Sequence, residues 1–199
     1  MKYPVGYLLS LTCTMLLSLN SAVLASDPPL AKAKIEGPAI TGEAIFSEAS
    51  QGLVRVNIEV NGDPKVLTAG LHGIHFHAVG SCDSGATPFS AAGGHFDPGP
   101  FGSPLPVEAN HPYHSGDLPN LVVNENGKGK LKIITSRVSL ADSPTSVFDA
   151  DGTAIIIHKL QDQIKTGGTA DEAGGGRLAC GIIQRGQGER EKGEKRGAD

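Results

Sequence analysis

Six of the seven histidines stand in an order and spacing that two adjacent metal ions would require. They lie in four short motifs: His75-Phe76-His77, Gly94-His95-Phe96-Asp97-Pro98, His111-Pro112-Tyr113-His114-Ser115-Gly116-Asp117 and Ile156-Ile157-His158. Histidine is the commonest protein ligand for zinc and copper, and copper(II) favours a nitrogen-rich tetragonal site. The four motifs together therefore predict metal binding, although any one of them alone would be weak.

The first motif has the period of a β-strand. On a strand, His75 and His77 lie on one face while Ile74 and Phe76 lie on the other. The apolar pair can then anchor the strand in a core while both imidazoles project toward one external point. His158 ends an apolar run on another predicted strand, where it can add a third nitrogen ligand.

The third motif has the composition of a zinc site. His111, His114 and Asp117 offer two nitrogens and one carboxylate within seven residues, and His95 completes a four-coordinate set typical of zinc. His72 is different, because it shares the strand parity of the apolar core residues. We interpret His72 as a buried, hydrogen-bonded histidine rather than a metal ligand.

The elements that carry these residues are predicted to be strands. Between Leu53 and Asn61, every second residue is Val or Ile, and the residues between them are polar. Glycine is abundant, at 27 of 199 residues, which suits turn-rich β proteins. We expect strands at 31–35, 44–48, 53–61, 71–78, 120–124, 130–133, 153–158 and 178–183, with no helix of three turns.

Two connections are too long for simple turns: Val79 to Leu118 and Lys159 to Gly176. Long loops in a compact domain are usually functional or disordered. The first holds several of the expected ligands, so we expect metal to order it. The strands and loops predict an antiparallel sandwich or flattened barrel.

The chain ends differ from its middle in composition. Residues 1–25 contain Lys2 as their only charge, an apolar stretch and small residues near Ala25, which indicates a secretory signal peptide; an uncleaved anchor is the alternative. We discount lipid modification of Cys13, because the residues before it do not fit. We expect one domain over 26–184 and a charged, disordered tail over 185–199.

Charge and cysteine content limit the kinds of binding partner and predict a crosslink. Removing the signal leaves 16 basic and 21 acidic side chains, a formal charge of −5, which argues against nucleic acid or an anionic membrane as partner. No stable membrane span is expected after signal cleavage. Export leaves Cys82 and Cys180, an even pair that predicts one disulfide, with two free buried thiols as the alternative.

The sequence resembles the copper,zinc superoxide dismutase family over roughly residues 30 to 184. The matching segments are Gly70 to His77, Gly93 to Pro98, His114 to Leu118, the Ile157-His158 pair and Gly176 to Gly181. The resemblance implies an all-β, eight-stranded antiparallel Greek-key barrel or sandwich with two long functional loops. It also implies an exported protein, periplasmic or secreted, and leaves a homodimer open.

The resemblance also implies roles for individual residues. It assigns copper to His75, His77, His95 and His158, and zinc to His95, His111, His114 and Asp117, with His95 bridging the two ions. Asp162 would link histidines of the two sites. His95 and Arg177 would be catalytic, with Arg177 positioning the substrate. Cys82 and Cys180 match the family's disulfide.

The implied activity is dismutation of superoxide to dioxygen and hydrogen peroxide, with copper and zinc as cofactors. A non-enzymatic exported copper carrier or buffer on the same barrel is the alternative, and a zinc-only structural protein is a third reading. Two departures from the family matter: the span from His95 to His111 is about twice the common length, and the loop before Arg177 is shortened. The zinc loop must therefore follow its own path.

Overall fold

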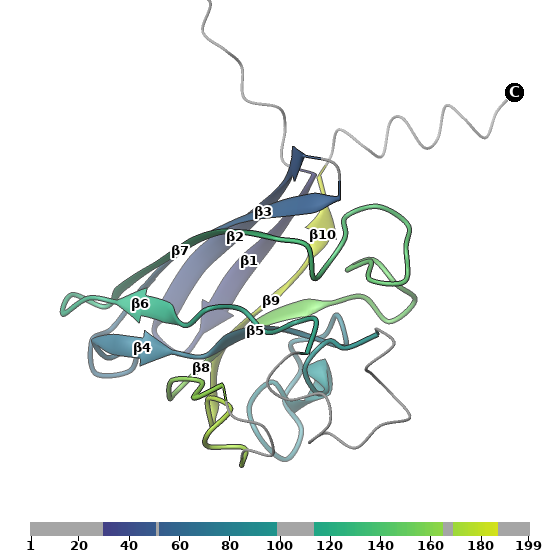
Figure 1. Ribbon diagram of the computed structural model, residues 1–199. Coiled ribbons are helices and arrows are strands. Elements are labelled where there is room, and N and C mark those ends of the chain that lie inside the picture. Colours follow the sequence, from purple (N-terminus) through teal and green to yellow (C-terminus); the bar gives the residue numbers. More distant parts are fainter. Residues whose placement is uncertain (1–29, 51, 99–113, 165–168, 187–199) are drawn as a thin grey trace, which may run out of the picture.

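The computed structural model describes residues 30–50, 52–98, 114–164 and 169–186. Figure 1 shows their strands side by side in a barrel, with long loops gathered at one end of it. The strands are β1 (Ala31–Gly37), β2 (Ile40–Ser50), β3 (Leu53–Gly62), β4 (Gly70–His72), β5 (Ile74–His77), β6 (Leu121–Val123), β7 (Lys128–Thr135), β8 (Ala154–His158), β9 (Arg177–Ile182) and β10 (Gln184–Arg185). One short 3-10 helix, η1 (Ser90–Ala92), is the only helix among the described residues, so the expected all-β class is confirmed.

Strand β3 shows how the alternating pattern becomes a barrel wall. Val54, Val56, Ile58 and Val60 are all buried, whereas Arg55 and the other intervening residues are partly or fully exposed. The strand pairs antiparallel with β2 on one side and β7 on the other. Because side chains alternate between the two faces of a strand, this register directs these four apolar residues inward.

The barrel is closed by a strand that is interrupted at Gly73. The sheet order is β4-β6-β7-β3-β2-β1-β9-β8-β5, so β4 and β5 lie at its two ends although only Gly73 separates them in sequence. The Gly73 carbonyl accepts the His158 N–H at 2.8 Å, and the Gly73 N–H donates to Leu160 at 2.7 Å. Counting β4 with β5, and β9 with β10, as interrupted strands leaves the expected eight.

The main core is one cluster of buried apolar side chains inside this barrel. Its fully buried members include one phenylalanine from each of β2, β5 and the following loop, and branched aliphatic residues from most strands; they include Phe46, Phe76, Phe96, Ile35, Ile58, Leu121 and Ile155. Phe76 packs 5.8 Å from Phe46, measured between ring centroids. Burial of Ile74 and Phe76 fixes the orientation of β5, and therefore the direction in which His75 and His77 project.

The two long connections run between β5 and β6 and between β8 and β9, as expected. Figure 1 shows both on the same side of the barrel, beside β5 and β8. The disulfide between Cys82 and Cys180 ties the first connection to β9, with a Cα–Cα distance of 5.7 Å across a sequence separation of 98 residues. The predicted disulfide is thus confirmed, and the alternative of two free thiols is excluded.

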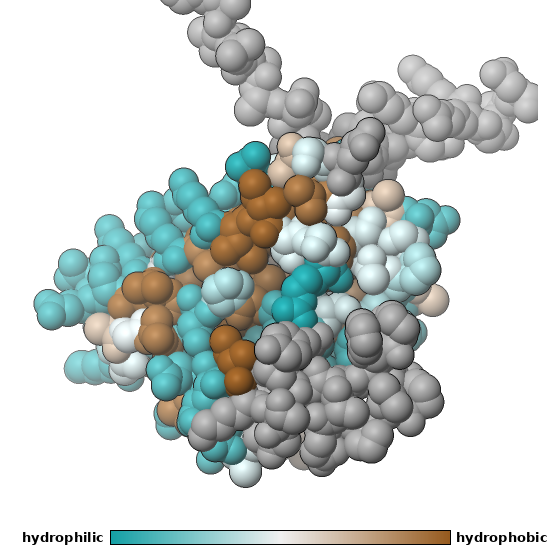
Figure 2. Space-filling view, in the orientation of Figure 1, coloured by the Kyte–Doolittle hydropathy of each residue, from teal (hydrophilic) through white to brown (hydrophobic). Residues whose placement is uncertain are grey.

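The face shown in Figure 2 carries many polar residues and several apolar areas, one of which lies over β4 and β6. Leu71 and Val122 are register partners on these strands and are 46% and 60% exposed. Within the described ranges no helix is long and apolar enough to cross a membrane. The pairing of two copies into a homodimer stays a prediction.

The described barrel continues slightly past the expected domain boundary at residue 184. Arg185 pairs with Ala31 in the β1–β10 ladder, its guanidinium lies 4.0 Å from the centroid of the Phe148 ring, and the Gly186 N–H donates to Leu30. The expected signal peptide and most of the expected tail, 187–199, lie outside the described residues, and so does His111.

Loss of the disulfide should destabilise the protein strongly. The Cys82→Ser/Cys180→Ser double variant should lose about 4.7 kcal/mol of unfolding free energy, because a crosslink closing about 100 residues restricts the unfolded chain by that amount in the chain-entropy model. Denaturant unfolding of the oxidised protein and the double variant measures the difference. An unchanged midpoint would contradict this account.

Candidate metal centre

Strands β5 and β8 place three imidazoles at one point outside the barrel wall. His75 and His77 lie on the outer face of β5, and His75 is the register partner of Ile156 on β8. His158 ends β8 on the same outer face, where the β8–β9 register shifts. All three are buried, at 4% exposure or less, because the two long loops cover this part of the barrel.

His95 joins these three from the loop after β5. An isolated bridge pairs His77 with His95, and the His75 and His95 ring centroids lie 4.0 Å apart. One ring nitrogen from each of His75, His77, His95 and His158 lies within 4.8 Å of all the others. The predicted four-nitrogen cluster is therefore brought together, and its composition suits copper.

The outer nitrogens of the three strand histidines all face oxygen acceptors. His75 Nε2 lies 2.9 Å from Asp162 Oδ2, His77 Nδ1 lies 2.9 Å from the Gly93 carbonyl, and His158 Nδ1 lies 3.0 Å from the Gly175 carbonyl. A carbonyl oxygen can only accept a hydrogen bond, so Nδ1 of His77 and Nδ1 of His158 each carry a proton. The Asp162 carboxylate acts in the same way on His75.

This hydrogen bonding leaves one nitrogen of each ring facing inward with its lone pair available. For His77 and His158 that atom is Nε2, and the two Nε2 atoms lie 3.3 Å apart. For His75 it is Nδ1, which is buried without a hydrogen-bond partner. A buried nitrogen that lacks a partner is costly unless a ligand satisfies it, so the cluster fits a metal ion.

Burial also keeps these imidazoles neutral. It lowers the pKa of His158 to about 3, and the positive charge of Arg177 adds to the effect. Burial lowers the pKa of His75 and of His77 as well, although the Asp162 hydrogen bond opposes the shift at His75. Neutral imidazole is the form that binds metal, so the cluster is ready for a cation at neutral pH.

A second cluster shares His95 with the first. His95 Nδ1 lies 2.8 Å from Asp117 Oδ1, and His114 Nδ1 lies 3.3 Å from Asp117 Oδ2. Burial would raise the pKa of Asp117, but the hydrogen bonds from His114 and His95 outweigh it and hold that pKa well below its usual range. These three residues offer two nitrogens and one carboxylate, a donor set that suits zinc. The fourth expected ligand, His111, lies outside the described residues.

Asp162 lies at the junction of the two clusters. One carboxylate oxygen of Asp162, one of Asp117 and one ring nitrogen of His75 lie within 4.8 Å of one another. Its backbone is held by Asn120, whose side-chain amide donates to the Asp162 carbonyl and whose side-chain oxygen accepts the Asp162 N–H, both at 2.8 Å. The sequence offered no signal for Asn120, because the partnership joins residues far apart in the chain.

Arg177 begins β9 beside the first cluster. Its Nη1 donates to the Phe89 carbonyl and its Nη2 to the Gly93 carbonyl, each at 2.5 Å. Gly93 adopts φ 74°, a conformation that L side chains rarely adopt, and its carbonyl also accepts the His77 Nδ1 proton. One carbonyl therefore orients both a metal-facing imidazole and the nearest arginine.

The interpretation of His72 as a buried, hydrogen-bonded histidine is confirmed. Its Nδ1 lies 2.8 Å from the His158 carbonyl and its Nε2 lies 2.9 Å from the Thr68 carbonyl, so both ring nitrogens are occupied. His72 thus holds the end of β8 from the barrel side. Gly174 supports His158 from the other side, since a Cβ there would come within 2.8 Å of the His158 Cβ.

The metal-free protein should lose stability as the pH falls. His75, His77 and His158 stay neutral in the folded state, whereas in the unfolded chain they protonate near their ordinary pKa of 6.5. The unfolded chain then binds more protons, so the unfolding free energy declines below about pH 6.5 and, for His158, down to about pH 3. Calorimetry across that range tests this, and His158→Gln should make the decline shallower. A melting temperature independent of pH would contradict it.

Comparison with known proteins agrees with this geometry. The family model described as copper/zinc superoxide dismutase matches residues 40–183. The chain is 41% identical over 152 residues to "Superoxide dismutase [Cu-Zn]" of Deinococcus radiodurans, covering 73% of this chain and 78% of that protein. It is 32% identical over 185 residues to the protein of the same name from Escherichia coli K12, covering 84% and 97%.

Solved structures agree on the fold. A SOD-like protein from Bacillus subtilis superposes with a TM-score of 0.61 at 28% identity, covering 76% of this chain and 96% of that one. The family model spans strands β2 to β9, both long connections and every described residue of the two histidine clusters. The chain therefore belongs to the copper/zinc superoxide dismutase family and is a superoxide dismutase that uses copper and zinc.

Proposed function

We propose that His75, His77, His95 and His158 bind copper, and that His95, His114, Asp117 and His111 bind zinc. The single observation that supports the copper assignment best is the buried Nδ1 of His75, which has no hydrogen-bond partner while Nε2 is held by Asp162. His75 would bind through Nδ1, and His77 and His158 through Nε2.

His95 is proposed to serve both metals. Its Nδ1 lies beside Asp117, which belongs to the zinc set, so its Nε2 is the nitrogen available to the copper side. Zinc on Nδ1 would orient the ring and tune the basicity of Nε2. When Nε2 is not bound to copper, it can take up a proton from solvent and deliver it to the reduced product.

Bound copper supplies one-electron chemistry, through which one superoxide is oxidised to dioxygen and a second is reduced to hydrogen peroxide. The protein itself shields the site from solvent and holds the imidazoles in place. Burial of His75, His77 and His158 keeps solvent away from these three imidazoles. Asp162 and Asn120 hold His75 in one orientation, so the cluster needs little rearrangement during turnover.

Arg177 is proposed to capture and position the substrate anion. Two backbone carbonyls fix its guanidinium, and its charge is felt at both His77 and His158, whose pKa values it helps to lower. The formal charge of the whole chain is −4, so attraction of an anion must come from local positive charge. The fixed guanidinium of Arg177, beside the proposed copper ligands, provides this local positive charge.

We further propose that the protein acts outside the cytoplasm, in the periplasm or after secretion. The Cys82–Cys180 disulfide supports this, because structural disulfides persist mainly in oxidising compartments. The apolar N-terminal 25 residues would serve as the signal peptide. Fractionation of cells producing the full chain, followed by sequencing of the mature N-terminus, tests both statements.

The rival function is an exported copper carrier. A carrier needs the four imidazoles but has no use for a fixed guanidinium or for a second cluster that shares His95. Superoxide turnover by the purified, metal-loaded protein separates the two functions. Binding of copper without turnover would favour the carrier.

The site should bind one copper and one zinc per chain. Replacing His158 with Ala should abolish turnover and copper binding while zinc content stays near one per chain, because His158 lies in the first cluster only. Elemental analysis after stoichiometric loading measures both metals. Saturation of the wild-type chain by a single metal ion would contradict the two-metal site.

Replacement of Arg177 should slow turnover without loss of copper. Arg177→Glu should reduce the rate at least tenfold, about 1.4 kcal/mol in the barrier, since it places a like charge beside the anion. Arg177→Lys should have a smaller effect. Arg55→Glu is the matched control, because Arg55 is exposed on β3, in the middle of the sheet order and away from β5 and β8.

The dependence on salt provides a second measurement of the same prediction. The wild-type rate should fall as ionic strength rises, because the field of Arg177 is screened over about 10 Å at 0.1 M salt. The Arg177→Glu variant should lose this fall or reverse it. A wild-type rate that is independent of salt would rule out anion capture by Arg177.

A further inference from the structure

Phe89 has an unusual backbone conformation at the point where it contacts Arg177. Its φ of 55° and ψ of 26° lie in the left-handed region, which non-glycine residues rarely occupy and bulky ones occupy least. Glycine would adopt this conformation without steric cost. The chain nevertheless carries phenylalanine here, so contacts of its side chain or backbone must compensate for the strain.

The left-handed backbone turns the Phe89 carbonyl toward Arg177. That carbonyl accepts a hydrogen bond from Arg177 Nη1 and another from the Ala92 N–H at 3.2 Å. The Phe89 N–H donates to Ser84 Oγ at 3.1 Å. Both polar groups of the Phe89 backbone are therefore occupied, which holds the carbonyl in place.

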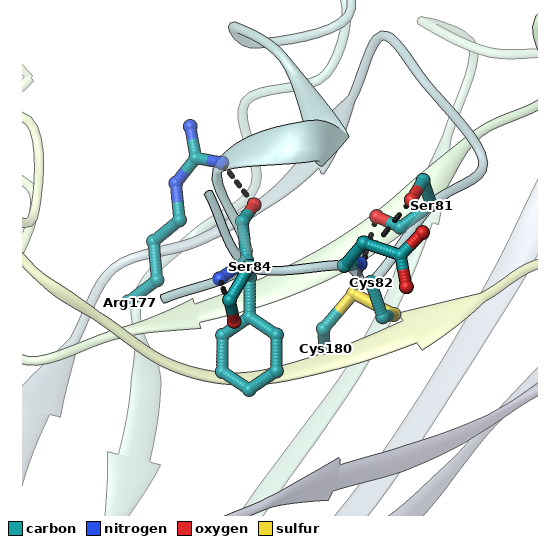
Figure 3. The surroundings of a disulfide bond; sticks show 7 residues. Ser81, Cys82, Ser84, Arg177 and Cys180 are labelled. Carbon is teal, nitrogen blue, oxygen red and sulfur yellow. Dashed lines mark hydrogen bonds between the residues drawn. A yellow bond between two sulfur atoms is a disulfide. The ribbon is translucent and has the colours of Figure 1, made fainter. Parts of the chain in front are cut away.

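The Phe89 ring anchors this turn on the disulfide. It packs against a small cluster of its own, formed by Ala92, Ala154, Ile156 and Cys180, with Cys82 beside it. Figure 3 shows Arg177 and the Cys82–Cys180 bridge on either side of Ser84. The ring thus connects the crosslinked loop and strands β8 and β9 to the backbone atom that holds the guanidinium.

Gly93, four residues after Phe89, provides the second backbone carbonyl that holds the Arg177 guanidinium. Its carbonyl accepts Arg177 Nη2, and it also accepts the His77 Nδ1 proton. Loss of the Gly93 contact would disturb the copper side as well. The Phe89 carbonyl accepts hydrogen bonds from Arg177 and Ala92 and, among the described residues, from no histidine, so a change there affects the positioning of Arg177 without a direct effect on the histidines.

We propose that Phe89 is a positioning residue for the superoxide dismutase reaction. Its ring, packed on the disulfide cluster, holds a strained backbone carbonyl that fixes Arg177 Nη1 in the orientation that receives the substrate anion. The inference rests on the proposed role of Arg177 in anion capture. It adds that this role depends on an apolar contact outside both histidine clusters.

The test compares Phe89→Ala with Phe89→Leu in the copper- and zinc-loaded protein. Azide is the probe, and its dissociation constant for the copper(II) protein is measured by optical titration. Phe89→Ala should weaken azide binding about three- to tenfold, since each tenfold is about 1.4 kcal/mol, while copper and zinc contents stay unchanged. Phe89→Leu, which keeps an apolar side chain of similar reach, should restore most of the affinity.

A direct readout of Arg177 accompanies the titration. In the reduced copper(I), zinc protein, NMR measures hydrogen exchange of the Arg177 guanidinium, which should accelerate by a similar factor in Phe89→Ala. Phe148→Ala is the matched control, because Phe148 is also partly buried and contacts an arginine, Arg185, near the chain ends. It should leave both measurements unchanged.

Ser84→Ala keeps the test decisive if Phe89→Ala does not fold. It removes only the side-chain acceptor of the Phe89 N–H, and it should shift both measurements in the same direction by a smaller factor. Azide affinity and guanidinium exchange within about twofold of wild type, in whichever variant folds, would overturn the proposal. Loss of copper in proportion to loss of azide affinity would also overturn it, since that indicates a structural role only.

Arg177→Glu, which reverses the charge, separates failure of this inference from failure of the proposed function. If it leaves azide affinity unchanged, Arg177 does not capture anions, and the proposed role of Arg177 is wrong whatever Phe89 does. If it weakens azide binding and Phe89→Ala does not, the role of Arg177 stands and the inference about Phe89 is wrong. Guanidinium exchange reports on the Phe89 contact in either case.

Discussion

The need of each buried imidazole for an oxygen acceptor on its outer nitrogen organises the whole site. His75, His77 and His158 lie out of contact with water, so an unpaired outer N–H would be costly. The acceptors are Asp162 and the carbonyls of Gly93 and Gly175, all of which lie in the two long connections. The loops therefore cover the histidines and determine which nitrogen faces inward.

The same loops connect the proposed metal ligands to the arginine proposed to capture the substrate. The segment from Cys82 to Gly93 is held to β9 by the disulfide, and within this short segment lie both carbonyls that hold Arg177. The Gly93 carbonyl also orients His77. Rigidity of this one segment thus serves two purposes, and two uncommon backbone conformations, at Phe89 and Gly93, are the local cost of placing both carbonyls.

The barrel wall supplies the remaining precision. Burial of Ile74 and Phe76 leaves β5 only one way to face, and its pairing with β8 places His75 opposite Ile156. A shift of one residue in this register would turn both imidazoles into the core and both apolar residues outward. The histidines on these strands are therefore positioned by hydrophobic burial on the opposite face of the same strands.

The sequence by itself determined the strands and the types of ligand. Alternation from Leu53 to Asn61 predicts a half-buried strand, and the parity of His75 and His77 predicts that they act together, because both follow from the two-residue period of a β-strand. The number of cysteines in an exported chain predicts the disulfide. The resemblance of the motifs to a known family then supplied the expected order of the ligands and the expected role of Arg177.

Tertiary structure alone decided which ring nitrogens face inward and which groups hold them. No local pattern shows that His75 presents Nδ1 while His77 presents Nε2, that Asn120 holds Asp162, or that the carbonyl of Phe89 holds Arg177. The contacts of His75, Asn120 and Phe89 join segments more than 40 residues apart in the chain, and the contact of His77 with Gly93 spans 16 residues of a long loop. Side-chain type and period are local properties that a sequence displays directly, whereas hydrogen bonds between distant segments depend on how the barrel closes and where its loops are tied.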